Sequence, residues 1–359
     1  MHPCKANLWL FTAVAIAVIA AANPFYRPEI PLQVGVALWV ADMLLVLVLA
    51  LRPFTARLGL PVALLLFPVP IFVQASSVSR FALMVLTALA LAIAAAAFFA
   101  PPRFRKPLAV LFSWFGTKTI ARRPRKFDAI ALLRLVMAVV VFAFALGVLK
   151  TAAPAGAAWL LRWFSCGVAV FSFGEMVLAS QDFITAALGL DAPALGRSPW
   201  LSVSVGEFWT RRWNAAVSEL GFRYLFFRPL ARRGRVPALF AAFLASAIVH
   251  FLLCFMATGR WGISLAFGAF FLVQPPFILA ERALRVRRWP VRWARTWTLA
   301  ALAVTSPLFV EPVARMIMPL LDSTPTTLPA TGVMLGVAIG LNLFLALGQL
   351  MFCVAKTDQ

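Results

Sequence analysis

The chain has 359 residues, of which 63% are hydrophobic and only 13% are charged. A soluble globular protein is roughly 45–50% apolar, so the composition excludes that class and indicates an integral membrane protein. A net charge of +21 would suggest a nucleic-acid partner in a soluble protein. Here the basic residues fall between apolar runs, a pattern that reports membrane topology, and we expect no nucleic-acid partner.

Apolar windows recur along the whole chain and predict about ten transmembrane spans. We therefore expect one all-α integral membrane domain over residues 1–359, a polytopic transmembrane helical bundle. The first window lacks a clear cleavage site before a soluble region and is read as a span rather than a signal peptide. The windows cover residues 8–22, 32–51, 60–75, 80–100, 129–150, 156–178, 236–257, 261–281, 292–312 and 330–354.

The basic residues predict the orientation of these spans. With the N-terminus inside, most of the 33 lysines and arginines fall on one side, as the positive-inside rule requires. We therefore expect a multi-pass protein, of the bacterial inner membrane, with both termini in the cytoplasm. Membrane lipids are its expected surroundings. The four cysteines have no paired spacing, so neither a disulfide framework nor a metal site is expected.

Four segments leave two interpretations open. The window at 60–75 contains three prolines, so it is either a span or a broken, re-entrant segment. The basic and aromatic segment 101–128, like the loop from Arg282 to Arg295, is either an interfacial segment or an ordinary cytoplasmic loop. The loop at about 179–235 is rich in aromatic residues, and we expect it to pack on the bundle or dip into the bilayer.

A motif region at 200–257 concentrates the residues with chemical potential. Ser204 followed by Glu207 is a capping-box pattern and predicts a helix that starts at Val205. On a regular helix Asn214 would share a polar face with Arg211, opposite an apolar face that includes Val205, Phe208, Trp209, Ala216, Val217 and Leu220. The alternative is an amphipathic helix that lies on the inner leaflet with its arginines at phosphate level.

His250 is the second candidate in this region. It is the only histidine besides His2, and it lies in an apolar run that otherwise carries no ionisable group. Ionisable groups inside a membrane usually mark function, and small neighbours such as Ser246 and Ala247 leave room for a partner or a ligand. The alternative is a structural histidine that forms hydrogen bonds between helices.

Two stretches carry a resemblance to a known family. They read Phe208-Trp209-Thr210-Arg211-Arg212-Trp213-Asn214 and Ser246-Ala247-Ile248-Val249-His250. Together they resemble the wax synthase-like branch of the membrane-bound O-acyltransferases, in which a Phe-Trp-x-Arg-Arg-Trp-Asn motif precedes an intramembrane histidine in a Ser-Gly-x-x-His context. The chain departs from that pattern at Ala247, where glycine is usual, and at Phe251, where glutamate often follows the histidine.

The resemblance implies acyl transfer from a thioester to a hydroxyl. The donor would be acyl-CoA, or an acyl-carrier thioester, as a co-substrate without any cofactor, and the acceptor would be a lipophilic or small alcohol. His250 would be the general base, with Asn214 orienting it or the donor carbonyl. Burial favours the neutral imidazole, which can accept the hydroxyl proton. The residues expected to bind the substrate or acyl-CoA are Trp209, Arg211, Arg212, Trp213 and Ser246.

Several functional alternatives remain at this stage. The acceptor hydroxyl could belong to a glycan or a natural product, and Cys254, one turn from His250, keeps a covalent route open. A transporter or flippase would use Asp42, Glu175 and His250 as a polar pathway. For Asp42 and Glu175 we favour links between helices. For each arginine taken singly, from Arg211 to Arg233, lipid headgroups compete with CoA phosphates.

Overall fold

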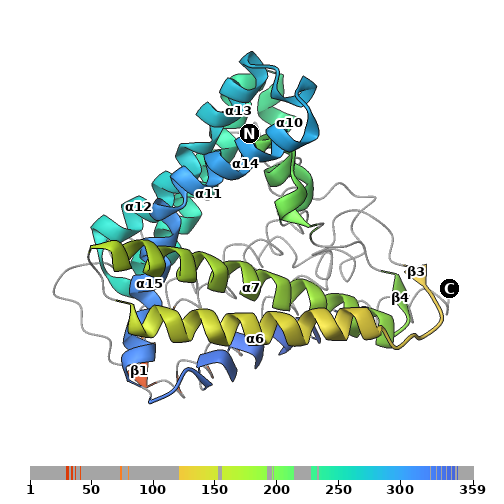
Figure 1. The fold of residues 1–359 in the computed structure, drawn as a ribbon, viewed down its shortest axis with the longest axis vertical. Helices are drawn as coiled ribbons and strands as arrows, with labels where there is room; N and C mark the ends of the chain where they lie inside the picture. Colours follow the sequence, from red (N-terminus) through yellow and green to blue (C-terminus); the bar gives the residue numbers. More distant parts are fainter. Residues whose placement is uncertain are drawn as a thin grey trace.

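The computed structural model describes residues 121–152, 156–191, 198–213, 228–232 and 234–323, together with separate positions between 30 and 80, Gly196, and most positions between 325 and 346. Within these residues the protein is helical (Figure 1). Four helical segments are long and apolar enough to cross a membrane, and a bent helix pair makes a fifth if it counts as one span. The protein is therefore an integral multi-pass membrane protein.

The long helices confirm four of the predicted spans. These are α6 (Ala129–Thr151), α7 (Ala157–Ala187), α11 (Arg235–Thr258) and the continuous segment Trp261–Ala283, which contains α12 (Trp261–Leu272) and α13 (Gln274–Ala283). The total of ten stays a prediction. The windows at 8–22, 32–51, 60–75 and 80–100 lie almost wholly outside the described residues, and the last window is described only in part.

One predicted boundary is wrong, and one predicted span is bent. The prediction ends the sixth span near residue 178, but α7 continues to Ala187. Its last turns contain polar residues that lowered the hydropathy, yet Thr185 is buried there because its hydroxyl donates to the Gln181 carbonyl (2.8 Å). The window at 292–312 falls on two helices bent by 50°, α14 (Val291–Thr305) and α15 (Pro307–Asp322), which together are long and apolar enough for one span. Pro307 has no backbone N–H to continue the first helix.

Short elements complete the described chain. Two-residue strands pair β1 (Ile30–Pro31) with β2 (Val73–Gln74) in parallel, and β3 (Ala121–Arg122) with β4 (Leu190–Asp191) in antiparallel fashion. The second pair joins the segment before α6 to the segment after α7. The remaining short helices are η4 (Pro199–Leu201), α8 (Val205–Glu207), the π-helix η5 (Phe208–Arg212), α10 (Arg228–Ala231) and η7 (Val286–Arg288).

Helices α6 and α7 form an antiparallel hairpin that α15 joins from one side (Figure 1). Helix α6 begins where the Asp128 carboxylate accepts the backbone N–H of Ala131 (3.0 Å), as an N-cap does. The buried core of this part contains Phe142, Leu146 and Leu149 of α6, and its members from α7 and α15 are Cys166, Ala169, Met176, Ala179, Val310, Ala314 and Leu321.

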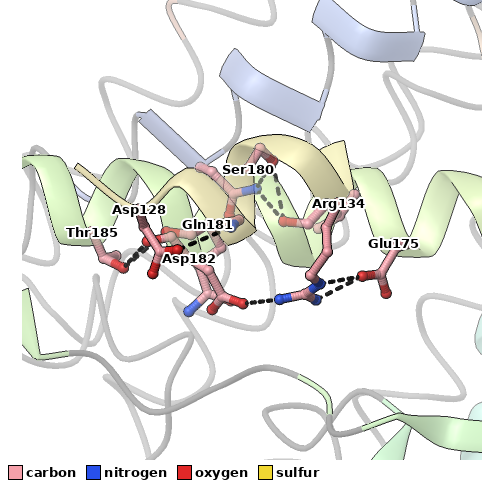
Figure 2. Close-up of polar contacts among 10 residues, drawn as sticks. Asp128, Arg134, Glu175, Ser180, Gln181, Asp182 and Thr185 are labelled. Carbon is pink, nitrogen blue, oxygen red and sulfur yellow. Dashed lines mark hydrogen bonds and ion pairs between the residues drawn. The ribbon is translucent and has the colours of Figure 1, made fainter. Parts of the chain in front are cut away.

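An ion network links the two helices of the hairpin. Figure 2 shows the Arg134 guanidinium of α6 between two carboxylates of α7, with Nε 2.7 Å from Glu175 Oε1 and Nη1 2.8 Å from Asp182 Oδ2. Glu175 and Asp182 lie about two turns apart on one helix, so a single planar guanidinium reaches both. This confirms the interpretation of Glu175 as a link between helices. Asp42 lies outside the described residues.

The Arg134→Leu variant is expected to be less stable than the wild type by about 1–2 kcal/mol, because it leaves two carboxylates near each other without their cation. The expected loss of stability is moderate because all three side chains are partly exposed. Thermal unfolding in detergent measures the effect. As a control, the triple variant Arg134→Leu/Glu175→Gln/Asp182→Asn removes every charge and should recover part of the loss. An unchanged unfolding midpoint in Arg134→Leu would contradict the prediction.

The close packing of α11 on α12 determines what lies beside the histidine. A Cβ atom added to Gly268 of α12 would lie 3.0 Å from the Ala247 carbonyl oxygen and 3.3 Å from Phe251 Cβ, both on α11. The absence of a side chain therefore lets the two helices approach closely, as small residues do in membrane bundles. The neighbouring aromatic residues on this side of α12 then reach α11.

Candidate functional site

The motif segment starts as its sequence predicts. The backbone N–H of Glu207 donates to Ser204 Oγ (2.9 Å), which confirms a helix that starts at Val205. The Glu207 carboxylate accepts the N–H of Val203 (2.9 Å) rather than that of Ser204, so the reciprocal half of the capping box is shifted by one residue. Both side chains together satisfy backbone donors that the helix itself leaves free.

The predicted continuation of this helix past Asn214 is wrong. After Glu207 the backbone widens into the π-helix η5, in which the Trp213 N–H donates to the Phe208 carbonyl (2.8 Å). Trp213 is already extended, with φ −96° and ψ 116°, so the helix ends at Arg212. The described helix therefore ends two residues before Asn214. Asn214, Ala216, Val217 and Leu220 lie outside the described residues. Single-turn π segments are frequent at functional sites.

Trp209 docks the motif segment onto α11 and α12. Its ring lies 5.9 Å from Phe243 of α11, and 5.9 Å and 5.6 Å from Phe270 and Phe271 of α12, measured between ring centroids. Edge-on and tilted aromatic pairs at these distances are favourable beyond their buried area. The indole Nε1–H of Trp209 donates to Gln274 Oε1 (3.2 Å), so the polar atom of the ring is also satisfied.

Gln274 joins three parts of the structure and is fully buried. Besides accepting from Trp209, its Nε2 donates to the Phe270 carbonyl (3.0 Å) and to Thr305 Oγ1 (3.2 Å) at the end of α14. A buried amide must find such partners or lose stability. The sequence marks Gln274 as a polar residue within a span, but sequence reasoning missed its role because both distant partners depend on packing.

Glu281 holds the start of the motif helix and was also missed. This α13 carboxylate is only 4% exposed and accepts the backbone N–H groups of Val205 (2.6 Å) and Gly206 (3.0 Å). A Cβ on Gly206 would lie 3.1 Å from Glu281 Oε1, so a residue with a side chain would crowd this contact. A carboxylate at a helix N-terminus receives free donors and faces the positive end of the helix dipole. The sequence marks Glu281 only as a single acidic residue at the end of an apolar window.

Trp213 faces the other side, toward α7. Its ring stacks on Phe208 with centroids 5.6 Å apart and lies 5.4 Å from Phe171 of α7. Gly174 of α7 lies below the same ring. The motif segment thus bridges the α6–α7 hairpin and the α11–α14 part of the bundle. Of the two tryptophans predicted to bind the substrate, Trp209 packs on α11 and α12, and Trp213 packs on α7.

The two motif arginines have different surroundings. Arg212 Nε lies 2.6 Å from Glu207 Oε1, and its side chain is mostly buried, whereas Arg211 is exposed to solvent. Burial by itself would raise the pKa of the Glu207 carboxyl, but the hydrogen bonds from the Val203 N–H and the Arg212 guanidinium outweigh it and lower that pKa. Arg212 is therefore occupied by a carboxylate of its own segment, and Arg211 is the motif cation that faces outward.

The lowered pKa of Glu207 predicts how the motif segment responds to acid. A carboxylate whose folded pKa lies below its unfolded value, about 4.3, stabilises at pH above that value. The contribution disappears as pH falls through the folded pKa. We therefore expect Glu207→Gln to have a lower unfolding midpoint than the wild type at pH 7, and the difference to shrink below about pH 4. Equal differences at pH 7 and pH 3.5 would contradict this expectation.

His250 lies on the face of α11 that carries Leu239 and Phe243, further along the same helix. Its Nδ1 lies 2.7 Å from the Ser246 carbonyl oxygen and 3.4 Å from Ser246 Oγ. A carbonyl can only accept, so the shorter contact places the proton on Nδ1 and leaves a lone pair on Nε2. The ring stacks on Phe271, with centroids 3.9 Å apart and planes at 30°, and meets the edge of Phe267 at 5.4 Å.

The structure thus brings Trp209, Ser246 and His250 into one region, with Phe271 between the motif tryptophan and the histidine. Of the other predicted residues, Trp213 contacts Phe171 of α7, Arg212 pairs with Glu207, and Arg211 is exposed. His250 is partly exposed, whereas the Cys254 thiol next to it along the helix is fully buried. In the described part of the chain, no three His, Cys, Asp or Glu side chains are grouped closely enough to hold a metal ion.

Comparison with known proteins supports the same region. The membrane bound O-acyl transferase family model matches residues 192–272. In Arabidopsis thaliana, probable long-chain-alcohol O-fatty-acyltransferase 7 is 32% identical over 143 residues, which cover 34% of this chain and 40% of that protein. Probable long-chain-alcohol O-fatty-acyltransferases 3 and 6 are 32% and 30% identical over 166 and 146 residues, covering 39% and 36% of this chain.

The chain therefore spans only 40% to 44% of the length of these curated relatives. The matched family segment contains the motif, His250 and the aromatic residues Phe267 and Phe271 that contact it, and it ends just before Gln274. The resemblance predicted from the two sequence stretches is confirmed. Residues 192–272 match the membrane bound O-acyl transferase family, and this part of the chain is distantly similar to the plant long-chain-alcohol O-fatty-acyltransferases.

Proposed function

We propose that the protein is a membrane O-acyltransferase that moves an acyl group from acyl-CoA to the hydroxyl of a long-chain or other lipophilic alcohol, with His250 as general base. The observation that carries the proposal is the hydrogen bond from His250 Nδ1 to the Ser246 carbonyl, inside the matched family segment. It leaves Nε2 as a proton acceptor in an apolar span, which is what activation of an alcohol requires.

The chemistry needs no covalent enzyme intermediate. His250 Nε2 takes the hydroxyl proton while the alcohol oxygen forms a bond to the thioester carbonyl carbon. The tetrahedral intermediate then expels the CoA sulfur, which receives the proton from the imidazolium, so His250 returns to its starting form. Asn214 would orient the histidine or donate to the developing oxyanion. The full burial of Cys254 supports direct attack over a thiol nucleophile.

A membrane site suits both substrates of this reaction. A long-chain alcohol and the acyl tail reach His250 from the bilayer, while the CoA phosphates require cations at the cytoplasmic side. Arg211 fits that role better than Arg212, because Arg211 is exposed and Arg212 is bound to Glu207. In this proposal the N- and C-termini also face the cytoplasm, where most basic residues of the chain collect.

Purified protein supplied with radiolabelled acyl-CoA and a panel of acceptors tests the proposal. We expect a labelled ester with long-chain alcohols. Product only with glycan or natural-product hydroxyls would keep the acyltransferase and replace the acceptor class. An acyl-carrier thioester in a parallel reaction identifies the preferred donor. No ester with any donor or acceptor, together with solute flux in protein-containing vesicles, would overturn the enzyme assignment in favour of transport.

A further inference from the structure

Phe271 is the side chain through which the motif segment reaches the histidine. Its ring is 4% exposed, stacks on His250 with centroids 3.9 Å apart, and lies 5.6 Å from the ring of Trp209. The sequence motif contains Trp209 and the span contains His250, but Phe271 belongs to neither. It comes from the end of α12, which the Gly268 contact holds against α11.

Gln274 restrains both the Trp209 ring and the backbone next to Phe271. Its side chain accepts from Trp209 Nε1 and donates to the carbonyl of Phe270, the residue before Phe271. The tryptophan ring and the backbone that carries Phe271 are therefore tied to one fully buried amide. A shift of the motif segment would move Trp209, and the packed Phe271 ring would have to follow because interiors of this density leave little free space.

The imidazole needs such a contact to have one orientation. The imidazole turns about its Cβ–Cγ bond, and the hydrogen bond from Nδ1 to the Ser246 carbonyl restrains this rotation only while it is formed. A stacked ring at 3.9 Å blocks this rotation on one face, and the edge contact with Phe267 restricts a second side. The position of Nε2 thus depends on Phe271 as well as on the hydrogen bond.

We propose that Phe271 is a positioning residue: packed between Trp209 and His250, it transmits the position of the motif segment to the imidazole and keeps Nε2 directed toward the substrate. The consequence for catalysis rests on the proposed function, whereas the effect on the ring of His250 does not. The role would make the docking of the motif segment a requirement for an active base, since a misplacement of about 1 Å can cost about a hundredfold in rate.

The neighbouring residue Phe270 provides a matched control. It is buried to a similar degree, also contacts Trp209 and Phe309, but has no ring contact with His250 among the described residues. We expect Phe271→Leu to lower kcat about tenfold or more relative to Phe270→Leu, with the KM for acyl-CoA in both variants within about twofold of the wild type. Phe271→Tyr retains the stacked ring and should keep most of the activity.

NMR reports the orientation of the His250 ring independently of the enzyme activity. In a His2→Ala background His250 is the only histidine, so ¹⁵N-histidine NMR in detergent micelles reports this ring alone. We expect a protonated Nδ1 and an unprotonated Nε2 in the wild type and in Phe270→Leu. Phe271→Leu should shift both signals or show a mixture of tautomers. If Phe271→Leu does not fold, the pair Phe271→Met and Phe270→Met carries the same comparison.

The outcomes distinguish this inference from the proposed function. Equal kcat values for the two leucine variants, or identical ¹⁵N signals in the wild type and Phe271→Leu, would overturn the role of Phe271 even if the wild type forms esters. Shifted ¹⁵N signals in Phe271→Leu would support the contact between the two rings. If His250→Ala kept full activity at the same time, the catalytic assignment of His250 would be rejected.

Discussion

His250→Ala is expected to lower ester formation by about 10²–10⁴-fold, the range that a positioned general base contributes. An alcohol is a weak nucleophile near neutral pH, and the span around His250, residues 236–257, offers no other acidic or basic side chain apart from the buried Cys254 thiol. The carbonyl of Ser246 holds Nδ1, so the loss of the ring removes a preset acceptor rather than a surface group. The measurement is the initial rate with acyl-CoA and the long-chain alcohol that the wild type uses best.

Two further variants make the result specific. His250→Gln retains a polar side chain of similar reach but cannot act as a base at neutral pH, so it should be as inactive as the alanine variant. His2→Ala removes the other histidine of the chain and should keep wild-type turnover. Thermal unfolding must show that the His250 variants are folded. A folded His250→Ala protein with undiminished kcat would remove this residue from the mechanism.

Glu281→Ala is expected to loosen the motif segment, with a loss of about 2–4 kcal/mol in stability. The carboxylate accepts two backbone N–H groups at 2.6 and 3.0 Å, and its removal leaves both donors buried without an acceptor. Removing a buried charge also recovers some hydration energy, which places the expected loss in the lower half of that range. Ester formation should fall about 10–100-fold because Trp209 and the residues after it lose their anchor.

Glu311 offers a matched control on α15. Its carboxylate pairs with Arg315 one turn away, and both side chains are partly exposed, so Glu311→Ala should change stability by less than about 1 kcal/mol. Glu281→Gln keeps one acceptor oxygen but adds a donor opposite the second N–H, and it should lie between the wild type and Glu281→Ala. Indistinguishable unfolding midpoints for Glu281→Ala and Glu311→Ala would show that the carboxylate does not hold the motif helix.

Sequence alone determined the features that depend on composition and on nearby residues. The apolar content required a membrane, and the long apolar windows predicted α6, α7, α11 and the segment Trp261–Ala283. The capping pattern predicted the start of the motif helix at Val205, because a cap is formed by residues three positions apart. The histidine was marked by its apolar surroundings. Each signal is local, so no knowledge of packing was needed.

Only the tertiary structure decided how these parts meet. The π-helical turn ended the motif helix at Arg212, and Arg212 is paired with Glu207 whereas Arg211 is exposed. Glu281 reaches Val205 across 76 positions of the chain, and Gln274 reaches Trp209 across 65. Such contacts depend on the close approach of α11, α12 and α13 to the motif segment, and helical periodicity carries no information about which distant helices will approach.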